Sequence, residues 1–105
     1  MQPFMFYLYI LYSQSSDLLY VGYSSDIPKR LTEHNAKPFD SFTARHRPWE
    51  LKASFLVGNN VSKALEIERF LKKQKSRKLI EKLCNPEFIP NGKLAQLVRV
   101  PDVRD

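Results

Sequence analysis

The sequence predicts a single α/β domain of the α+β kind, with its elements in the order β-β-α-β-α-α. Three observations support this class. At 105 residues the chain has room for one domain and one core. Apolar residues make up 43% of it, which is typical of a globular protein. Short apolar and aromatic runs are interspersed with segments whose apolar residues recur at helical spacing.

Two strands are expected in the N-terminal part. Residues 4–12 and 18–23 are rich in aromatic and branched side chains, and the SQSSD segment between them suits the turn of a hairpin. Both runs are apolar at successive positions, so we expect the sheet to be covered on both faces. The first run is too short to span a bilayer, and no basic segment precedes it as in a signal peptide.

The remaining elements follow from capping residues and periodicity. Ser25 or Asp26 is expected to cap a first helix, with Pro28 in its first turn. A basic loop is expected over residues 36–49 and a third strand over residues 49–57. Ser62 is expected to open a long helix over residues 61–75, and a shorter helix should cover residues 77–83.

The C-terminal segment, residues 89–105, has no clear hydrophobic period. We therefore expect residues 1–88 to form the domain and this tail to lie outside its core. The KLAQLVR stretch could also be encoded by DNA that reads like part of a tRNA gene. A reading frame that runs into such a gene would carry a tail never selected for folding.

Charge and cysteine content narrow the class of partner. The formal net charge of +6 favours an acidic partner such as nucleic acid, although it could also serve only solubility. The chain has one cysteine, Cys84, so it can form neither an internal disulfide nor a thiolate metal cage. This usage fits a reduced, cytoplasmic setting.

Glu68 gives the strongest local signal. On a helical wheel of residues 61–74, Glu68 falls inside the apolar arc, whereas Glu66 falls among basic residues on the opposite side. A carboxylate that faces the protein needs a partner, because an unpaired buried charge is costly. From the pattern alone, an ion pair with Arg30 or a lysine and a bound metal ion are equally good explanations.

Other candidate residues have both a structural and a chemical interpretation. Arg30 and His34 lie four residues apart on the core-facing side of the first helix, and the planar arginine fork suits a phosphate. A single inward histidine is more often a satisfied core residue. All five tyrosines lie in the first hairpin, where packing explains most of them. A tyrosine acts as a base only when cations or a metal lower its pKa of about 10.

Together these residues resemble the GIY-YIG family over about residues 4–88. Tyr7-Leu8-Tyr9 stands where GIY is expected and Tyr20-Val21-Gly22 where YIG is expected, with Arg30 and then His34 at the family's spacing. KALEIERFLKK resembles the metal-binding helix, with its glutamate at Glu68. RPWEL and IEKLCNPEF resemble small stand-alone bacterial members, which are related to the nuclease domain of the excision-repair protein UvrC. Two departures are Tyr7 in place of the first glycine and the lack of a clear asparagine after the metal helix.

The resemblance implies a central three-stranded antiparallel sheet and hydrolysis of DNA, which would be branched or damaged DNA in repair or recombination. One Mg²⁺ or Mn²⁺ would be held by Glu68, Arg30 would bind the scissile phosphate, and Tyr9 or Tyr20 would activate water with His34 assisting. A weakly active or inactive nucleic-acid-binding module of the same fold is the alternative. The candidate nucleic-acid contacts are Gly22, Arg45, Arg47, Lys72, Lys75 and Arg77.

Overall fold

The computed structural model describes residues 4–36 and 42–100. The elements follow the predicted order, with three additions. None of the helices in these two ranges is long and apolar enough to cross a membrane. The elements are β1 (Phe6–Ser13), β2 (Leu18–Ser24), α1 (Ile27–Ala36), α2 (Phe42–Arg45), β3 (Trp49–Gly58), α3 (Val61–Gln74), α4 (Arg77–Cys84), the 3-10 helix η1 (Gly92–Leu94) and β4 (Val98–Arg99).

The strands form one antiparallel sheet in the order β2-β1-β3-β4. The α+β class and the antiparallel sheet flanked by helices are confirmed, but the sheet has four strands where three were expected. Its centre is β1, which pairs with β2 on one side and β3 on the other. As a result β2 and β4 are the two edge strands of this sheet.

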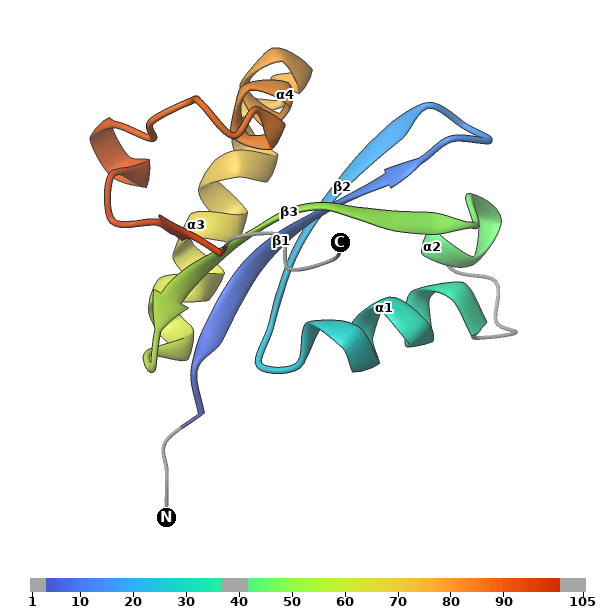
Figure 1. Cartoon of the computed structure of the whole chain (residues 1–105), viewed down its shortest axis with the longest axis horizontal. Helices are drawn as coiled ribbons and strands as arrows, with labels where there is room; N and C mark the ends of the chain where they lie inside the picture. The colour runs from blue at the N-terminus through green and yellow to red at the C-terminus, as the bar shows by residue number, and fades with distance from the viewer. Residues whose placement is uncertain (1–3, 37–41, 101–105) are drawn as a thin grey trace.

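Helices cover both faces of the sheet, as the doubly apolar strands predicted (Figure 1). Successive residues of β1 point to opposite faces, so Leu8 and Ile10 join a core beneath α3 and α4. Tyr9 and Leu11 point the other way and pack with Trp49, against residues of α1. The sheet therefore separates a larger aliphatic core from a smaller, more aromatic one.

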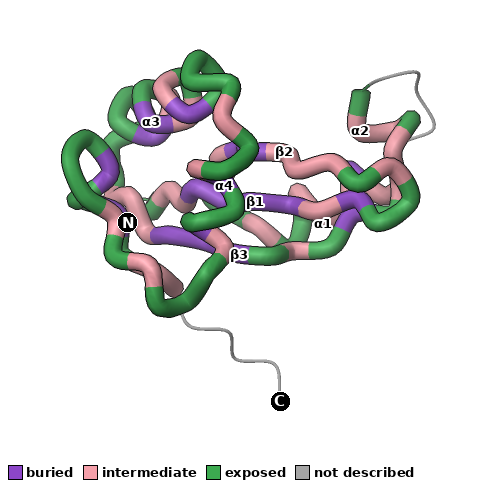
Figure 2. Tube along the Cα trace, turned by 90° about the horizontal axis from the view of Figure 1, so that it is seen from above, coloured by how far each residue is buried: buried purple, intermediate pink, exposed green. Residues whose placement is uncertain are grey.

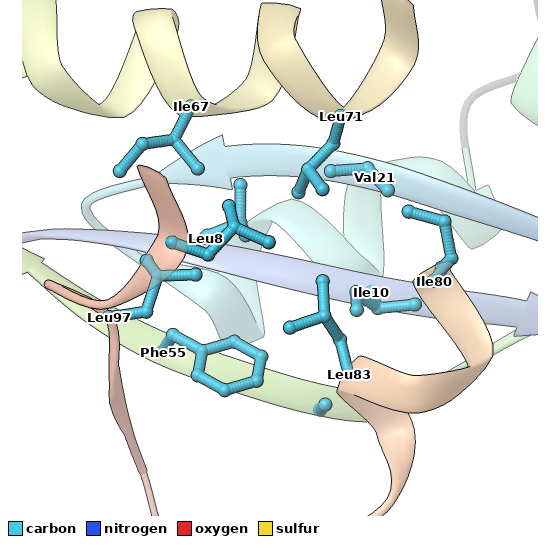
Figure 3. Close-up of a cluster of buried hydrophobic side chains, with 11 residues drawn as sticks. Leu8, Ile10, Val21, Phe55, Ile67, Leu71, Ile80, Leu83 and Leu97 are labelled. Atoms are coloured by element: carbon cyan, nitrogen blue, oxygen red, sulfur yellow. The ribbon is translucent and has the colours of Figure 1, made fainter. Parts of the chain in front are cut away.

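The larger core draws buried residues from β1, β2, β3, α3, α4 and η1. In Figure 3, side chains of α3, α4 and the C-terminal segment converge on Leu8, Ile10 and Phe55 of the sheet. Figure 2 shows that the buried stretches run along β1 and the inward sides of the helices, whereas the turns are exposed. Burying this apolar surface is the main favourable term in folding.

The described part of the tail, residues 89–100, contributes to the core, whereas residues 89–105 were expected to lie outside it. Within its described part, Leu94 and Leu97 are 4% and 6% exposed and belong to the larger core. β4 pairs with β3, and Arg99 Nη2 donates to the carbonyls of Leu83 (2.6 Å) and Asn85 (2.9 Å) at the end of α4. The tail has no period because its buried residues lie on a 3-10 turn and a loop rather than on one regular element. Residues 101–105 lie outside the described ranges.

Local hydrogen bonds explain where the helices start. Asp26 Oδ1 accepts from the Lys29 N–H (3.1 Å) and so caps α1, as one of the two predicted alternatives. The cap of α3 is Asn60 rather than the predicted opening residue Ser62, because its side chain accepts from the N–H of Ser62 and Lys63. Ser76 caps α4 in the same way.

The predicted basic loop contains the short helix α2, which side-chain bonds hold in place. The Trp49 indole N–H donates to the carbonyl of Thr43 (2.8 Å), inside α2. Asn35 at the end of α1 accepts from the Trp49 N–H (2.7 Å) and donates to the Trp49 carbonyl (3.0 Å). A four-residue helix with no apolar stripe gives no periodic signal, so the sequence could not predict it. Residues 37–41 of this loop lie outside the described ranges.

Candidate active site

The predicted catalytic residues come from four elements that meet around the edge strand β2. Tyr9 of β1 pairs with Gly22 of β2, and Leu11 pairs with Tyr20, which precedes Gly22 by two residues. Because side chains alternate across a sheet, this register places Tyr9 and Tyr20 on the same face. That face is covered by α1, which carries Arg30 and His34, while Glu68 lies on α3.

Tyr9, His34 and Arg30 form one hydrogen-bonded group. The hydroxyl oxygen of Tyr9 lies 2.9 Å from His34 Nε2, and the Arg30 guanidinium donates to the same hydroxyl. Tyr9 and His34 are 2% and 5% exposed, whereas the Arg30 side chain is 42% exposed and also pairs with Glu33 (3.1 Å). Since Arg30 is only a donor, the Tyr9 hydroxyl can donate its proton to His34 Nε2 or accept one from it, according to the tautomer of the ring.

Burial raises the pKa of Tyr9 to about 12. The hydrogen bond from Arg30 acts in the opposite direction, while the proximity of Tyr20 and Glu68 raises the pKa further, because it disfavours a negative charge on Tyr9. At neutral pH Tyr9 is therefore a protonated phenol. The carboxylate of Glu68 is connected to this site through Lys72, which pairs with Glu68 and also lies over the Tyr20 ring.

Gly22 lies directly beneath the Tyr9 ring. A Cβ atom at Gly22 would overlap the hydroxyl and would lie 2.5 Å from Cζ and 2.9 Å from Cε1 of Tyr9. Gly22 is also buried, so it offers no side chain and little backbone to a nucleic acid, contrary to its place among the predicted contacts. Its structural effect is to let the Tyr9 ring lie flat on β2 and reach His34.

Tyr20 is the second tyrosine of the site and belongs to an aromatic cluster. Its ring meets His34 edge-on, with centroids 5.2 Å apart, and packs against Trp49 at 5.8 Å. The ring of Phe42 stacks on it at 6.1 Å, with the planes 26° apart. Tyr20 is half-buried and borders a surface groove, so it is more accessible than Tyr9.

Glu68 faces the protein, as the helical wheel predicted, and its side chain is 16% exposed. Its carboxylate pairs with Lys72 of the next turn, with Oε2 and Nζ 3.4 Å apart. Of the partners left open by the sequence, the structure shows a lysine and not Arg30. Glu66 is 53% exposed and lies 3.9 Å from Lys93, so its predicted surface position is confirmed.

Three of the predicted nucleic-acid contacts line one groove of about 310 Å³ between β2 and the junction of α3 and α4. These are Lys72, Lys75 and Arg77, around a mainly apolar floor. Lys72 Nζ also lies 4.9 Å above the Tyr20 ring, a cation–π contact that connects the groove to the site. A basic wall over an apolar floor suits a nucleic-acid strand, whose phosphates and bases need different surroundings.

Arg77 also makes structural contacts, and the two remaining predicted arginines, Arg45 and Arg47, are not among the residues that line this groove. Arg77 donates to the carbonyl and the carboxylate of Asp17 (2.7 and 2.8 Å) and to Glu81 (3.0 Å), so it ties the hairpin turn to α4. Arg47 donates to the Asn35 carbonyl (3.2 Å), at the far end of α1. Arg45 is exposed at the end of α2.

Sequence reasoning missed Phe42, which lines the groove, and Asp17, which binds Arg77. Phe42 stands in a segment without hydrophobic periodicity, next to basic residues that suggested only a loop. Asp17 lies in the hairpin turn at φ 53°, where an aspartate is ordinary, and its partner Arg77 is 60 residues away. Neither the exposed Phe42 in the groove nor the Asp17–Arg77 ion pair leaves a local signal in the sequence.

Among the predicted site residues, Glu68 is the one carboxylate that could bind a metal ion. Among the described residues no three His, Cys, Asp or Glu side chains gather in one place. A single carboxylate fits Mg²⁺, which keeps several waters and shares the phosphate oxygens of its substrate. It does not fit zinc, which takes three or four protein ligands.

Comparison with known proteins agrees with the geometry. The model of the GIY-YIG catalytic domain matches residues 5–82, which include every predicted catalytic residue. No curated protein matches the chain. The matched region contains both strands of the hairpin, α1 and α3, and so covers the whole site. The chain therefore belongs to the GIY-YIG family, whose catalytic domains are typically nucleases.

Proposed function

We propose that this protein is a metal-dependent endonuclease that hydrolyses phosphodiester bonds of DNA, acts in repair or recombination, and works in the cytoplasm. The observation that carries the proposal is the buried Tyr9–His34 pair beside Arg30, with the inward carboxylate of Glu68 connected to it through Lys72 and the Tyr20 ring. A fold stabilised only by packing has no need of four polar groups here, since each costs desolvation.

Glu68 is the residue that would hold the metal ion, Mg²⁺ or Mn²⁺. When bound there, the ion would supply electrophilic stabilisation of the charge that develops on the phosphate oxygens. The limited exposure of the Glu68 side chain, 16%, supports this role, because a partly desolvated carboxylate attracts cations more strongly. Lys72 balances its charge in the protein alone.

The other residues would bind the phosphate and move the proton. Arg30 is 42% exposed and borders a cleft of about 450 Å³, so part of its guanidinium remains available for a phosphate. Tyr9 and His34 form a hydrogen-bonded pair, but burial raises the pKa of Tyr9 to about 12, so its phenol would pass a proton to Nε2 only when a bound cation lowers that pKa. Tyr20 is the alternative base, since it is the more accessible of the two tyrosines.

A matched pair of glutamates on α3 tests the proposal. Purified protein is incubated with supercoiled plasmid and with branched DNA, in Mg²⁺ or Mn²⁺, beside Glu68→Gln and Glu66→Gln. We expect Glu68→Gln to lose at least about 100-fold of the nicking rate, as expected when electrostatic stabilisation of a transition state is removed. Glu66→Gln should cut normally, since Glu66 is 53% exposed on the other side of the same helix.

Two results would contradict the proposal. Equal nicking by all three proteins would mean that Glu68 has no part in the reaction. Folded protein that binds DNA and cuts none of the substrates would favour the second candidate, a binding module of the same fold. The Lys72–Glu68 ion pair favours that candidate, because it satisfies the carboxylate without a metal ion.

A further inference from the structure

Phe42, the first residue of α2, is a large aromatic side chain that is 46% exposed. Part of its ring is packed, with the centroid 6.1 Å from Tyr20, 4.7 Å from His46 and 6.4 Å from Trp49. The rest of the ring faces solvent. An apolar ring that is held firmly and left half open is a surface on which another flat group can stack.

The ring is fixed in position by the bonds that anchor α2. Trp49 donates its indole N–H to the Thr43 carbonyl (2.8 Å), and His46 Nδ1 lies 2.8 Å from the Ser16 hydroxyl. The neighbouring aromatic rings then restrict the side chain itself. Because the ring is already held in place, a ligand that stacks on Phe42 would bind with little further loss of side-chain entropy.

The position of Phe42 suggests what that ligand is. Phe42 borders the groove that also contains Tyr20, Lys72 and Lys75. The cations suit the phosphates of a strand, and the exposed ring suits the flat face of a base. In a duplex each base is already stacked between its neighbours, so its face is not available. An aromatic side chain beside cations thus matches a strand with unpaired bases.

We propose that Phe42 stacks on an unpaired base of the DNA strand in the Tyr20–Lys72 groove, so that the substrate is DNA with unpaired nucleotides beside the bond that is cut. This inference rests on the proposed nuclease function and specifies its substrate class. Charge complementarity supports DNA as the occupant, since the chain carries a net charge of +6 and three cations line the groove.

The test measures binding separately from cutting. Protein with Glu68→Gln is titrated, by fluorescence anisotropy, into a labelled single strand, a duplex of the same sequence and a duplex with a short gap. We expect tighter binding of the single strand and the gapped duplex than of the intact duplex. Phe42→Leu keeps an apolar side chain but has no aromatic face, so it should weaken those two complexes at least about fivefold.

Three controls make the result specific. Phe42→Tyr keeps the ring and should bind like the parent, and Ile89→Ala, which removes a side chain that is 81% exposed and does not line the groove, should change nothing. Thermal unfolding of each variant checks that it folds. With 2-aminopurine in the gap, its fluorescence should change when the parent binds and should change less when Phe42→Leu binds, because stacking alters the surroundings of the base.

Two outcomes overturn the inference: equal affinity of the parent for all three DNAs, or gapped DNA bound as tightly by Phe42→Leu as by the parent. Either can occur while the protein with Glu68 intact still nicks plasmid, in which case the nuclease proposal stands without this substrate class. If nicking fails but the Phe42 effects appear, the groove binds unpaired DNA in a protein that does not cut it.

Discussion

Replacing Gly22 by alanine tests whether the close contact between β2 and Tyr9 organises the site. The added Cβ would lie 2.5 Å from Tyr9 Cζ, whereas ordinary contacts of this kind are 3.4–4 Å. The ring must therefore move by about 1 Å, and it has no free space, since Tyr9 is 2% exposed. Such overpacking costs about 1–3 kcal/mol. Without the overlap, alanine in a strand interior would be more stable than glycine by about 0.5–1 kcal/mol. The overlap is the larger effect, so we expect the substitution to lower the free energy of unfolding.

The same displacement should affect activity more than stability. The 2.9 Å contact between the Tyr9 hydroxyl and His34 Nε2 cannot survive a shift of this size unchanged. Misplacing a reacting group by about 1 Å can reduce the rate by about 100-fold. We therefore expect Gly22→Ala to lower the free energy of unfolding in urea by about 1–2 kcal/mol and to reduce plasmid nicking by about two orders of magnitude.

A double-mutant cycle shows whether the overlap is the cause. Tyr9→Leu removes the ring atoms that the new Cβ would meet, so Gly22→Ala should cost much less stability in that background. The reasoning is refuted if Gly22→Ala alone stays within about 0.5 kcal/mol of the parent and nicks normally. It is equally refuted if the two substitutions simply add.

Three further predictions concern the phenol, the tail and the groove. Because the pKa of Tyr9 is raised from 10.0 to about 12, the unfolded chain loses this proton first, and stability falls as the pH rises from 10 towards 12. Urea unfolding over this range should show a loss of up to about 1.4 kcal/mol per pH unit that Tyr9→Phe removes, and equal slopes for the two proteins would contradict it. Leu97→Ala should lower the free energy of unfolding by about 2–5 kcal/mol, since Leu97 is 6% exposed, whereas Val98→Ala at 59% exposed should have little effect; a small loss for both would mean that the tail does not support the core. Lys75→Ala should lower the slope of log affinity for DNA against log salt concentration by about one unit. Arg77→Ala should lower that slope less, because Asp17 and Glu81 already bind its guanidinium. Anisotropy titrations at several salt concentrations measure both slopes, and a larger change for Arg77→Ala would mean that Arg77 rather than Lys75 binds the phosphate.

Local patterns in the sequence were sufficient to predict most helices and strands and the inward position of Glu68. Runs of aromatic and branched residues and the helical spacing of apolar residues depend on near neighbours along the chain, so they located the hairpin, the third strand and the longer helices close to their observed bounds. The same periodicity separated the inward Glu68 from the exposed Glu66. Motif spacing then indicated the family, which the match over residues 5–82 confirms.

The tertiary structure decided what depends on distant segments meeting. The strand register, which no local pattern fixes, placed Tyr9 and Tyr20 on one face and set Gly22 beneath the Tyr9 ring. Long-range packing added β4 to the sheet and brought Leu97 into the core, although the tail shows no period. Within the regular helices and strands, the sequence by itself determined which residues turn inward, because that follows from local geometry. Only the folded chain determined which partners they meet, because those contacts join segments far apart in the sequence.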